Sequence, residues 1–345
     1  MNRKVLVAMS GGVDSSVAAY MLKKQGYRAE AVTMCFGVDK SGDDDNVKDA
    51  SRVCSALGIK HRTVDFSGEL EEKVIKPFIN EYKKGRTPNP CVFCNRDIKF
   101  GIFIDYARES GFDLVATGHY AAIVERDGSF FLSKPKDEKK DQTYFLYGIR
   151  KEYLGSILFP LCGSVKSEVI KVAGDQQWGL SRRPQSQDIC FIKDGDYRNF
   201  LLDRIGSVKP GKIIDAEGNI IGEHKGFLYY TIGQREGLGI GGGKPYYVIS
   251  IDAEKNVLVA GREESLGSKV LTACDLNLFT ECLPQRCRAK IRYAHKEADC
   301  SISLGDNELR LEFDDLQRAV TPGQSVVLYD DDIVIGGGII RDIIE

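Results

Sequence analysis

A short segment rich in glycine and serine, which joins an apolar run to a helical pattern, constrains the fold most. Ser10–Ser16 (SGGVDSS) follows directly on the apolar run Val5–Met9 and opens a helical pattern over Val13–Leu22. At such a junction, backbone N–H groups and a helix N-terminus can hold phosphate oxygens. An isolated Ser-Gly-Gly triplet would be only a tight turn with a helix N-cap. The whole segment, placed between a strand and a helix, predicts a phosphate site.

Two details distinguish this segment from the kinase-type phosphate loop. No lysine follows the glycines, whereas the kinase-type loop ends in one. Asp14 would repel a bare phosphate, and one reason for a carboxylate here is to help hold Mg²⁺ on a pyrophosphate. We therefore expect a nucleotide that carries Mg²⁺.

The order of the expected elements predicts the fold class. Strand-like and helix-like runs alternate through the first third, which is typical of a parallel sheet with helices on both faces. Ligands of such sheets lie at the carboxyl ends of strands, where Gly118-His119-Tyr120 follows the strand expected at 113–116. From about Lys209 onward glycines cluster and alternating patterns replace helical ones. We expect an α/β domain over 1–205, a small β-rich domain over 206–265 and a C-terminal β-barrel over 266–345.

Composition limits the compartment and the partners. The 345 residues have Lys+Arg 48 against Asp+Glu 50, a formal net charge of −2, so any nucleic-acid site must be a local basic patch. The start, MNRKVLVAMSGG, has no apolar signal core, and no run of about 18 apolar residues occurs. We expect a cytoplasmic protein with no membrane partner. Disulfides are then rare, so each of the 10 cysteines is core filler, a metal ligand or a reactive thiol.

Three cysteines stand in unusual surroundings. Cys91 and Cys94 follow two prolines and lead into a helical pattern, which predicts a lowered pKa for Cys94 near a helix N-terminus. Cys190 lies where a polar stretch turns apolar. The remaining seven are expected to be structural: Cys35, Cys54, Cys162, Cys274, Cys282, Cys287 and Cys300.

The nucleotide segment resembles the signature of the PP-loop ATP pyrophosphatases, which cleave ATP between the α and β phosphates. With the other motifs, the chain resembles the tRNA-specific 2-thiouridylases of that superfamily along nearly its whole length. The motifs that carry this resemblance are SGGVDSS, TPNPxxxCN (Thr87–Asn95), ATGHY (Ala116–Tyr120), KDQTYFLY (Lys140–Tyr147), SQDICFI (Ser186–Ile192), GEHKGFLYYTIGQREGLGIGG (Gly222–Gly242), Arg292-Tyr293 and TPGQSVVLY (Thr321–Tyr329). The resemblance implies an adenine nucleotide alpha hydrolase-like fold and thiolation of the wobble uridine of tRNA.

The resemblance also implies roles for single residues. Cys190 would carry a persulfide delivered by a sulfur-donor protein, and Cys94 would be the nucleophile that resolves the intermediate. The residues implied for ATP are Ala8, Met9, Ser10, Gly11, Gly12, Val13, Asp14, Ser15, Met34 and Gly118. Those implied for tRNA and its target base are Asn89, Pro90, Cys91, His119, Lys140, Asp141, Gln142, Arg292, Tyr293 and Gln324.

One departure from the family leaves a second sulfur carrier open. Many members have aspartate where this chain has Cys91, and the cysteine creates a Cys-x-x-Cys pair. With Cys190 it supplies three thiolates, a number suited to a [4Fe–4S] cluster with one open iron. A structural zinc site would want a fourth ligand, and none is evident.

Two basic patches support a tRNA partner, because phosphate contacts provide much of the affinity for nucleic acids. One patch surrounds Cys94 and the other lies in the β region, although charge runs are usually solvated faces. Their members are Lys83, Lys84, Arg86, Arg96 and Lys99, then Arg286, Arg288, Lys290 and Arg292.

Two other functions remain as alternatives. An adenylating enzyme for a small substrate would explain the nucleotide segment but not the cysteines. A binding module without activity would explain only the basic patches.

Overall fold

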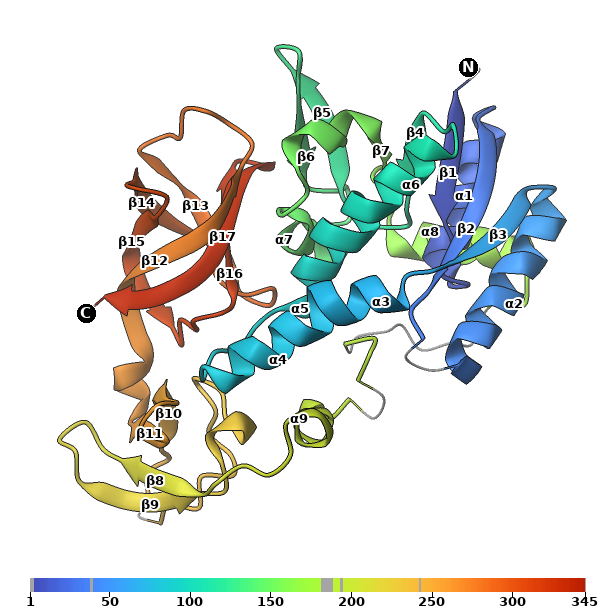
Figure 1. The fold of residues 1–345 in the computed structure, drawn as a ribbon. Helices are drawn as coiled ribbons and strands as arrows, with labels where there is room; N and C mark the ends of the chain where they lie inside the picture. The colour runs from blue at the N-terminus through green and yellow to red at the C-terminus, as the bar shows by residue number, and fades with distance from the viewer. Residues whose placement is uncertain (1–2, 38–39, 181–188, 193–194, 242, 345) are drawn as a thin grey trace. The chain divides into compact units, whose positions relative to one another are not determined.

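The computed structural model describes residues 3–37, 40–180, 189–192, 195–241 and 243–344 (Figure 1). It divides into two compact units. Unit 1 comprises Met1–Val74, Cys91–Lys193 and Asp331–Ile335, and unit 2 comprises Ile75–Pro90, Asp194–Asp330 and Gly336–Glu345. Our three-part division, with boundaries at 205/206 and 265/266, stays a prediction.

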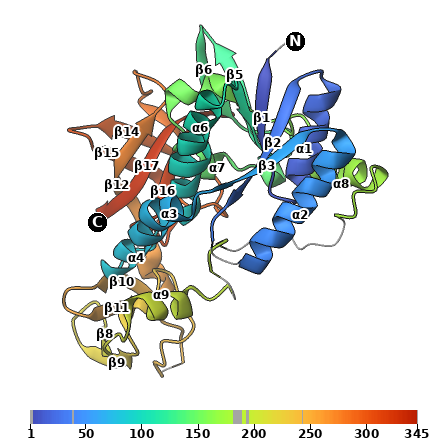
Figure 2. The same cartoon turned by 45° about the vertical axis from the view of Figure 1, so that its right-hand side comes forward.

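Unit 1 is built on a five-stranded parallel sheet with the order β3-β2-β1-β4-β7. Its strands are β1 Lys4–Ala8, β2 Arg28–Cys35, β3 Lys60–Asp65, β4 Leu114–Ala116 and β7 Ile157–Leu158. Because successive side chains point to opposite faces, Val5 and Val7 share one core with α1, α2 and α8, while Leu6 faces the other way. Figure 2 shows α1 and α6 on opposite sides of these strands. The expected parallel sheet with helices on both faces is confirmed.

The helices of unit 1 are α1 Val13–Lys24, α2 Lys40–Leu57, α3 Ser67–Leu70, α5 Pro90–Phe93, α6 Phe103–Glu109, α7 Thr143–Leu146 and α8 Lys166–Asp175. Shorter or irregular turns are η1 Glu71–Ile75, η2 Cys94–Ile102, η3 Glu138–Lys140 and η4 Lys151–Ser156. A hairpin of β5 Ala122–Arg126 and β6 Ser129–Ser133 turns through Asp127 and Gly128, which have φ of 50° and 74°. Asp-Gly is a preferred pair for such a turn because both positions need positive φ.

Unit 2 contains a four-stranded sheet, β10-β11-β8-β9, and a barrel. The sheet strands are β8 Gly211–Ile214, β9 Ile220–His224, β10 Tyr247–Asp252 and β11 Val257–Gly261. The barrel strands are β12 Gly267–Leu278, β13 Arg286–Lys290, β14 Ala298–Leu304, β15 Leu309–Arg318, β16 Ser325–Asp330 and β17 Ile333–Ile344. Pairing of β12 with β17 closes the barrel, which removes its exposed edges and confirms the expected C-terminal β-barrel.

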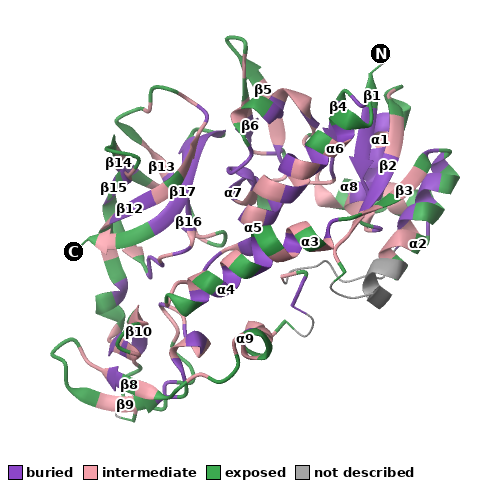
Figure 3. Ribbon diagram, viewed as in Figure 1, coloured by how far each residue is buried: buried purple, intermediate pink, exposed green. Residues whose placement is uncertain are grey.

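The other elements of unit 2 are α4 Lys76–Lys83, α9 Tyr197–Ile205, η5 Phe227–Tyr229 and η6 Glu263–Leu266. Aromatic pairs join the two helices: Phe78 with Phe200 and Tyr82 with Tyr197, at centroid distances of 6.3 and 5.1 Å. Figure 3 shows β1 of unit 1 as largely buried, while β2 is buried only at its centre, over residues 31–33. Within the described ranges, no helix has the length and apolar character needed to cross a membrane.

Candidate active site

The segment after β1 is held in a shape that only glycine permits at its centre. Gly11 has a φ of +71°, and a Cβ atom there would lie 2.6 Å from the Asn46 carbonyl oxygen. The turn leads into α1, which begins at Val13 with Gly12 as its N-cap. The first N–H groups of a helix have no partner within it, so this end of α1 can bind an anion.

Serine hydroxyls brace the loop from within. Ser15 Oγ lies 3.1 Å from Ser10 Oγ and accepts from the Ser10 N–H at 3.2 Å. Ser16 Oγ donates to the Gly12 carbonyl oxygen at 2.8 Å. These bonds fix the curvature of the loop, and Ser10 itself stays exposed.

Other residues implied for ATP lie at the same edge of the sheet. Gly118 follows β4, and a Cβ there would lie 2.6 Å from the Ser15 backbone nitrogen, so the two segments are in close contact. Met34 is near the carboxyl end of β2, and β1 pairs with both β2 and β4. The structure therefore brings Ala8–Ser15, Met34 and Gly118 to the carboxyl ends of neighbouring parallel strands, the usual place for ligands.

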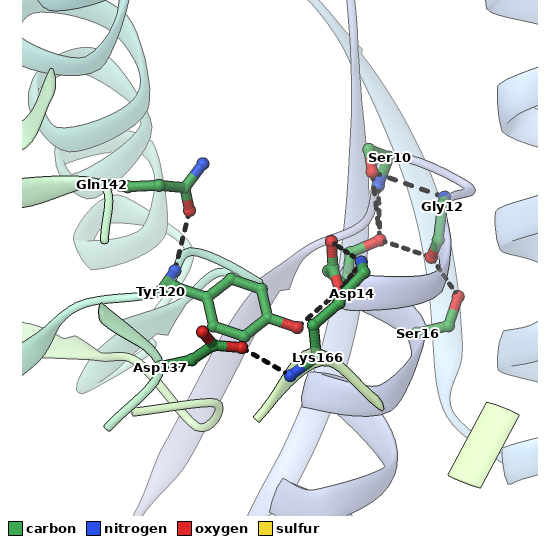
Figure 4. A network of polar contacts seen from close by, with 9 residues as sticks. Ser10, Gly12, Asp14, Ser16, Tyr120, Asp137, Gln142 and Lys166 are labelled. Carbon is green, nitrogen blue, oxygen red and sulfur yellow. Dashed lines mark hydrogen bonds and ion pairs between the residues drawn. The ribbon is translucent and has the colours of Figure 1, made fainter. Parts of the chain in front are cut away.

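A lysine from far along the chain contacts the loop (Figure 4). Lys166 Nζ donates to both carboxylate oxygens of Asp14, at 2.6 and 2.7 Å, and the Lys166 side chain is only 12% exposed. Tyr120 Oη donates to the same carboxylate at 3.0 Å. The sequence analysis missed Lys166, because 152 positions separate it from Asp14 and it stands in no motif that we singled out.

The three cysteines share one site in unit 1. The charges of Cys190 and Lys99 act on both Cys91 and Cys94, so these four side chains are neighbours. Cys94 is 6% exposed, whereas Cys91 and Cys190 are exposed. The lowered pKa expected for Cys94 is wrong for this structure: burial raises the pKa of the thiol to about 12, although Lys99 acts in the opposite direction. The helix begins at Pro90 and continues into η2, so Cys94 lies beyond its first exposed turn.

An unusual helix places Lys99 beside the thiols. The chain is π-helical over Cys94–Ile102, with a kink at Phe100, where φ is −122° and ψ is 17°. Such segments are rare and often functional. Because a π-helix bonds residue i to i+5, Cys94 and Lys99 fall one turn apart on the same side. Burial alone would lower the pKa of the Lys99 ammonium, but the neighbouring thiols outweigh burial and raise the pKa.

His119 lies against the same helix. Its ring centroid is 5.6 Å from that of Phe100, and its Nδ1 lies 2.7 Å from Thr117 Oγ1. Burial, followed by the charge of Lys99, lowers the pKa of His119 to about 3. The imidazole is therefore neutral at pH 7 and can donate or accept one hydrogen bond without carrying charge.

A metal ion needs several donor side chains that lie close together. Among the residues with described positions, no three His, Cys, Asp or Glu side chains are grouped closely enough to hold a metal ion. Asp14, whose two oxygens here accept from Lys166, is the carboxylate at the loop that would hold Mg²⁺, because Mg²⁺ often takes one carboxylate together with substrate phosphates.

In unit 2, two motifs that are far apart in the sequence lie side by side. The Thr87 N–H donates to the Pro322 carbonyl oxygen at 3.0 Å, and Gln324 Nε2 donates to the Thr87 carbonyl oxygen at 2.7 Å. The segment Thr87–Pro90, with the implied base contacts Asn89 and Pro90, is thus supported by the turn before β16. Gln324 has a structural hydrogen bond here in addition to its implied contact with tRNA.

Several residues implied for tRNA are engaged within the protein. Asp141 is 7% exposed, and its Oδ1 accepts from the Thr143 N–H at 2.8 Å at the start of α7. Arg292 donates to the Ala319 carbonyl oxygen at 2.6 Å and to Thr321 Oγ1. Tyr293 is 42% exposed, and Lys140 is partly exposed. Tyr293 and Lys140 are therefore the more accessible members of this set.

Many members of the basic patches are paired with carboxylates. Glu81 pairs with Lys84 and with Arg86, and Arg96 pairs with Asp97. In the barrel, Arg286 pairs with Asp314 at 2.5 Å and Arg288 with Glu297 at 3.5 Å. These pairs reduce the net positive charge that either patch presents.

Of the SQDICFI motif, Ser186, Gln187 and Asp188 lie outside the described residues, as does Gly242.

Three family models match consecutive parts of the chain. They are the tRNA methyl transferase HUP domain over residues 3–194, the tRNA methyl transferase PRC-barrel domain over 198–262 and the aminomethyltransferase beta-barrel domain over 268–340.

Known structures resemble the chain weakly. A 4-thiouridine synthetase–RNA complex with bound ATP has a TM-score of 0.36 at 20% identity, and covers 53% of this chain and 43% of its own. NMN synthetase from Francisella tularensis has a TM-score of 0.33 at 18% identity, and covers 54% of this chain and 66% of its own. Scores this low support no conclusion.

Curated relatives match over almost their full length. The tRNA-specific 2-thiouridylase MnmA of Clostridioides difficile (strain 630) is 46% identical, over 99% of both chains. That of Halothermothrix orenii is 47% identical, over 98% of this chain and 99% of its own. That of Acetivibrio thermocellus is 46% identical, over 98% and 99%. At this identity and coverage, the chain belongs to the family of tRNA-specific 2-thiouridylases.

Proposed function

We propose that this protein uses ATP to replace the 2-oxygen of the wobble uridine of tRNA with sulfur. One observation carries the proposal: a single folding unit contains both a loop at a helix N-terminus, suited to anions, and a group of thiols beside the half-buried Lys99. The relatives named as tRNA-specific 2-thiouridylases supply the substrate and the reaction. Both tRNA and ATP are available in the cytoplasm, where we place the protein.

The first step would activate the base. Uridine O2 attacks the α phosphate of ATP, an O–P bond forms, and pyrophosphate leaves. The N-terminus of α1 and the loop N–H groups would bind phosphate oxygens, while Lys166 would balance the negative charge beside Asp14. Mg²⁺, held by Asp14 and the phosphates, would neutralise charge on the pyrophosphate.

The second step would transfer sulfur. A sulfur-donor protein would load Cys190, which is exposed and so accessible to it, with a persulfide. The terminal sulfur of the persulfide attacks C2 of the adenylated uridine, Cys94 attacks the inner sulfur, and AMP departs. A Cys94–Cys190 disulfide results, which an external thiol reduces. Because burial raises the pKa of Cys94 to about 12, this thiol would need a change in its surroundings before it reacts.

The tRNA would be held by the residues that the family resemblance implies. Cys91 and His119 lie in the thiol site of unit 1, and Lys140–Gln142 lie in the segment before α7. Asn89, Pro90, Arg292, Tyr293 and Gln324 belong to unit 2. The target base would leave its stack to reach the thiols, as bases do in other enzymes that modify them.

Cysteine variants test the proposal directly. Cys94→Ser and Cys190→Ser should each still convert some ATP to AMP and pyrophosphate yet form no 2-thiouridine, with exposed Cys282→Ser as the control. The product is measured by mass spectrometry of digested tRNA, which separates a sulfur-for-oxygen exchange from an added methyl group. Normal thiolation by both variants would refute the sulfur-transfer mechanism. ATP cleavage that depends on a small substrate and ignores tRNA would instead favour another adenylating enzyme.

A second candidate keeps the reaction but changes the sulfur carrier. Cys91 makes a Cys-x-x-Cys pair with Cys94, and both neighbour Cys190. These three thiols would be the protein ligands of a [4Fe–4S] cluster. Anaerobic purification followed by an absorption spectrum and assays of iron and sulfide answers this. A colourless, iron-free protein that thiolates tRNA from a persulfide donor would remove the cluster candidate.

A further inference from the structure

Tyr120 bonds to two functional segments at once (Figure 4). Its hydroxyl donates to Asp14 Oδ1 in the first turn of α1, at 3.0 Å. Its main-chain N–H donates to Gln142 Oε1 at 2.8 Å, and its carbonyl oxygen accepts from the Gln142 N–H at 3.0 Å. The side chain thus reaches the nucleotide loop while the backbone is fixed to the segment Lys140–Gln142.

The bond to Asp14 is well placed to transmit a displacement. Tyr120 is only 3% exposed, so its ring cannot move far without moving its neighbours. Burial, followed by the charge of Asp14, raises the pKa of the hydroxyl above its usual range, so it remains a hydrogen-bond donor at working pH. A hydrogen bond to a charged carboxylate is also stronger than one between neutral groups.

A second connection runs in parallel with the first. Asp137 Oδ2 accepts from the Lys166 N–H at 2.8 Å, and the Asp137 carbonyl oxygen accepts from the Lys140 N–H at 2.9 Å. Lys166 in turn donates to Asp14. Both connections therefore begin in residues 137–142 and end on the carboxylate of Asp14.

We propose that Tyr120 is a positioning residue that couples tRNA binding at Lys140–Gln142 to the orientation of Asp14 in the nucleotide loop. The inference rests on the proposed function, because it assumes that tRNA contacts Lys140–Gln142 and that ATP binds at the loop. A shift of Gln142 moves the Tyr120 backbone through two hydrogen bonds and so moves its hydroxyl. Asp14 then changes its hydrogen bonds beside the phosphates. Such coupling is reciprocal, so ATP must also change the affinity for tRNA.

The test compares two tyrosine-to-phenylalanine variants of the 345-residue chain. Tyr120→Phe removes only the hydroxyl that reaches Asp14. Tyr153→Phe is the matched control. Tyr153 is also buried, and its hydroxyl donates to a carboxylate oxygen of Asp105 at a distance of 3.2 Å. Neither residue belongs to the nucleotide loop. A purely structural tyrosine would change stability alone, whereas a coupling residue changes the ratio of two rates.

The first readout is the rate of ATP conversion to AMP and pyrophosphate with and without saturating tRNA. Removal of the hydroxyl also removes a hydrogen bond to Asp14, so the rate without tRNA can itself fall, and the deciding quantity is the ratio of the rate with tRNA to the rate without it. We expect Tyr120→Phe to lower this ratio by about tenfold, within the usual range of coupling. Tyr153→Phe should behave as the unaltered protein does. The second readout is the tRNA Kd with and without a non-hydrolysable ATP analogue, and Tyr120→Phe should make the two Kd values converge.

The outcomes separate this inference from the proposed function. Two outcomes refute the coupling while the function stands, both with an unaltered protein that forms 2-thiouridine. In one, Tyr120→Phe keeps the full stimulation of ATP cleavage by tRNA. In the other, tRNA does not stimulate ATP cleavage by the unaltered protein. If the unaltered protein forms no 2-thiouridine, the proposed function itself fails. Should Tyr120→Phe fold poorly, Gln142→Leu breaks the other end of the connection, and full stimulation in that variant overturns the inference equally.

Discussion

Lys166 supplies the nucleotide loop with a cation that the loop sequence lacks. Its Nζ contacts both oxygens of Asp14, and little of the side chain is exposed. Removal of the ammonium would leave a carboxylate without its cation beside the expected phosphates. The pair therefore keeps the loop from repelling its ligand.

Lys166→Met should weaken ATP cleavage. A hydrogen bond to a charged group contributes about 2 kcal/mol, so we expect kcat/KM for ATP to fall roughly thirtyfold. Steady-state kinetics measure this. Lys136→Met is the control, because Lys136 is a nearby exposed lysine whose Nζ lies 3.9 Å from Glu168. Equal effects of the two variants would contradict the role given to Lys166.

Cys54 should make stability depend on alkaline pH. It is fully buried, and burial raises the pKa of its thiol to about 11, whereas an unfolded cysteine titrates near about 8.5. Between these values the folded state keeps a proton that the unfolded state loses. The free energy of unfolding therefore falls as pH rises, by about 1.4 kcal/mol per pH unit from this group.

Urea unfolding of the unaltered protein and of Cys54→Ala at pH 8, 9 and 10 measures this contribution. The difference in unfolding free energy between the two should shrink as pH rises, because Cys54→Ala lacks the thiol that titrates. Parallel curves across this range would show that Cys54 keeps an ordinary pKa.

The residue types of the site were predictable from the sequence, but their electrostatic state was not. Cys54 was expected to be structural, and its side chain is fully buried. Cys94 was expected to be acidic from its place after two prolines, yet burial dominates its pKa. Desolvation depends on side chains packed from elsewhere in the chain, and local sequence does not specify them.

A matched pair of glycine-to-alanine substitutions in connecting segments separates the cost of a positive φ from the cost of a steric clash. Gly11 and Gly128 have similar φ values of +71° and +74°, but only Gly11 has an atom near where a Cβ would lie. Gly128→Ala should therefore cost about 1 kcal/mol from the backbone alone. Gly11→Ala should cost more and should also abolish ATP binding, because the loop must move away from the Asn46 carbonyl oxygen.

Unfolding free energies and calorimetric ATP titrations of both variants provide the comparison. If Gly11→Ala binds ATP as well as Gly128→Ala does, the contact with the Asn46 carbonyl oxygen does not constrain the loop.

Strands β13 and β14 bring two of the cysteines classed as structural face to face. Cys287 and Cys300 are paired in register, and their sulfur atoms lie 3.9 Å apart. Neighbouring antiparallel strands have Cα separations within the range that disulfides span. We expect mild oxidation with diamide to link this pair, while the exposed Cys282 remains a thiol. Peptide mapping checks this, and a linked Cys282 in its place would contradict it.

The elements themselves differ in how well their sequences predict them. Val5–Met9 and the helix from Val13 were expected and are present, because an apolar run and a 3.6-residue period are local signals. The π-helix over Cys94–Ile102 was expected only as a helix, since Ile98, Ile102 and Tyr106 also fit an α-helical period. Its wider turn, which places Lys99 beside Cys94, has no sequence signature that we recognised.

On the scale of the whole molecule, the chain passes between its two units several times. Ile75–Pro90 and Gly336–Glu345 belong with unit 2, while Asp331–Ile335 belongs with unit 1. Composition divides the chain into consecutive domains, whereas packing divides it into units that exchange segments, and the three-part division stays a prediction. Changes in pattern along the sequence reveal where the type of structure changes, but they do not reveal which segments pack together.

A chain that ends at residue 205 should therefore leave the segment Ile75–Pro90 without part of its support. It would lose the hydrogen bonds from Thr87 to Pro322 and from Gln324 to Thr87. Limited trypsin digestion, followed by mass spectrometry, should cut after Lys83 or Lys84 faster in this truncated chain than in the 345-residue chain. Equal rates would indicate that the segment holds its structure without the later strands.

The assignment of Asp331–Ile335 to the unit with the nucleotide loop has a consequence for synthesis on the ribosome. Ser133 Oγ and the Lys134 N–H both donate to the Asp332 carbonyl oxygen, so this unit lacks part of its hydrogen bonding until residue 332 has been translated. The strand, loop and helix that open the sequence emerge first, yet their unit is completed among the last. A nascent chain released before that point would present an incomplete catalytic unit to the proteases that clear unfinished proteins.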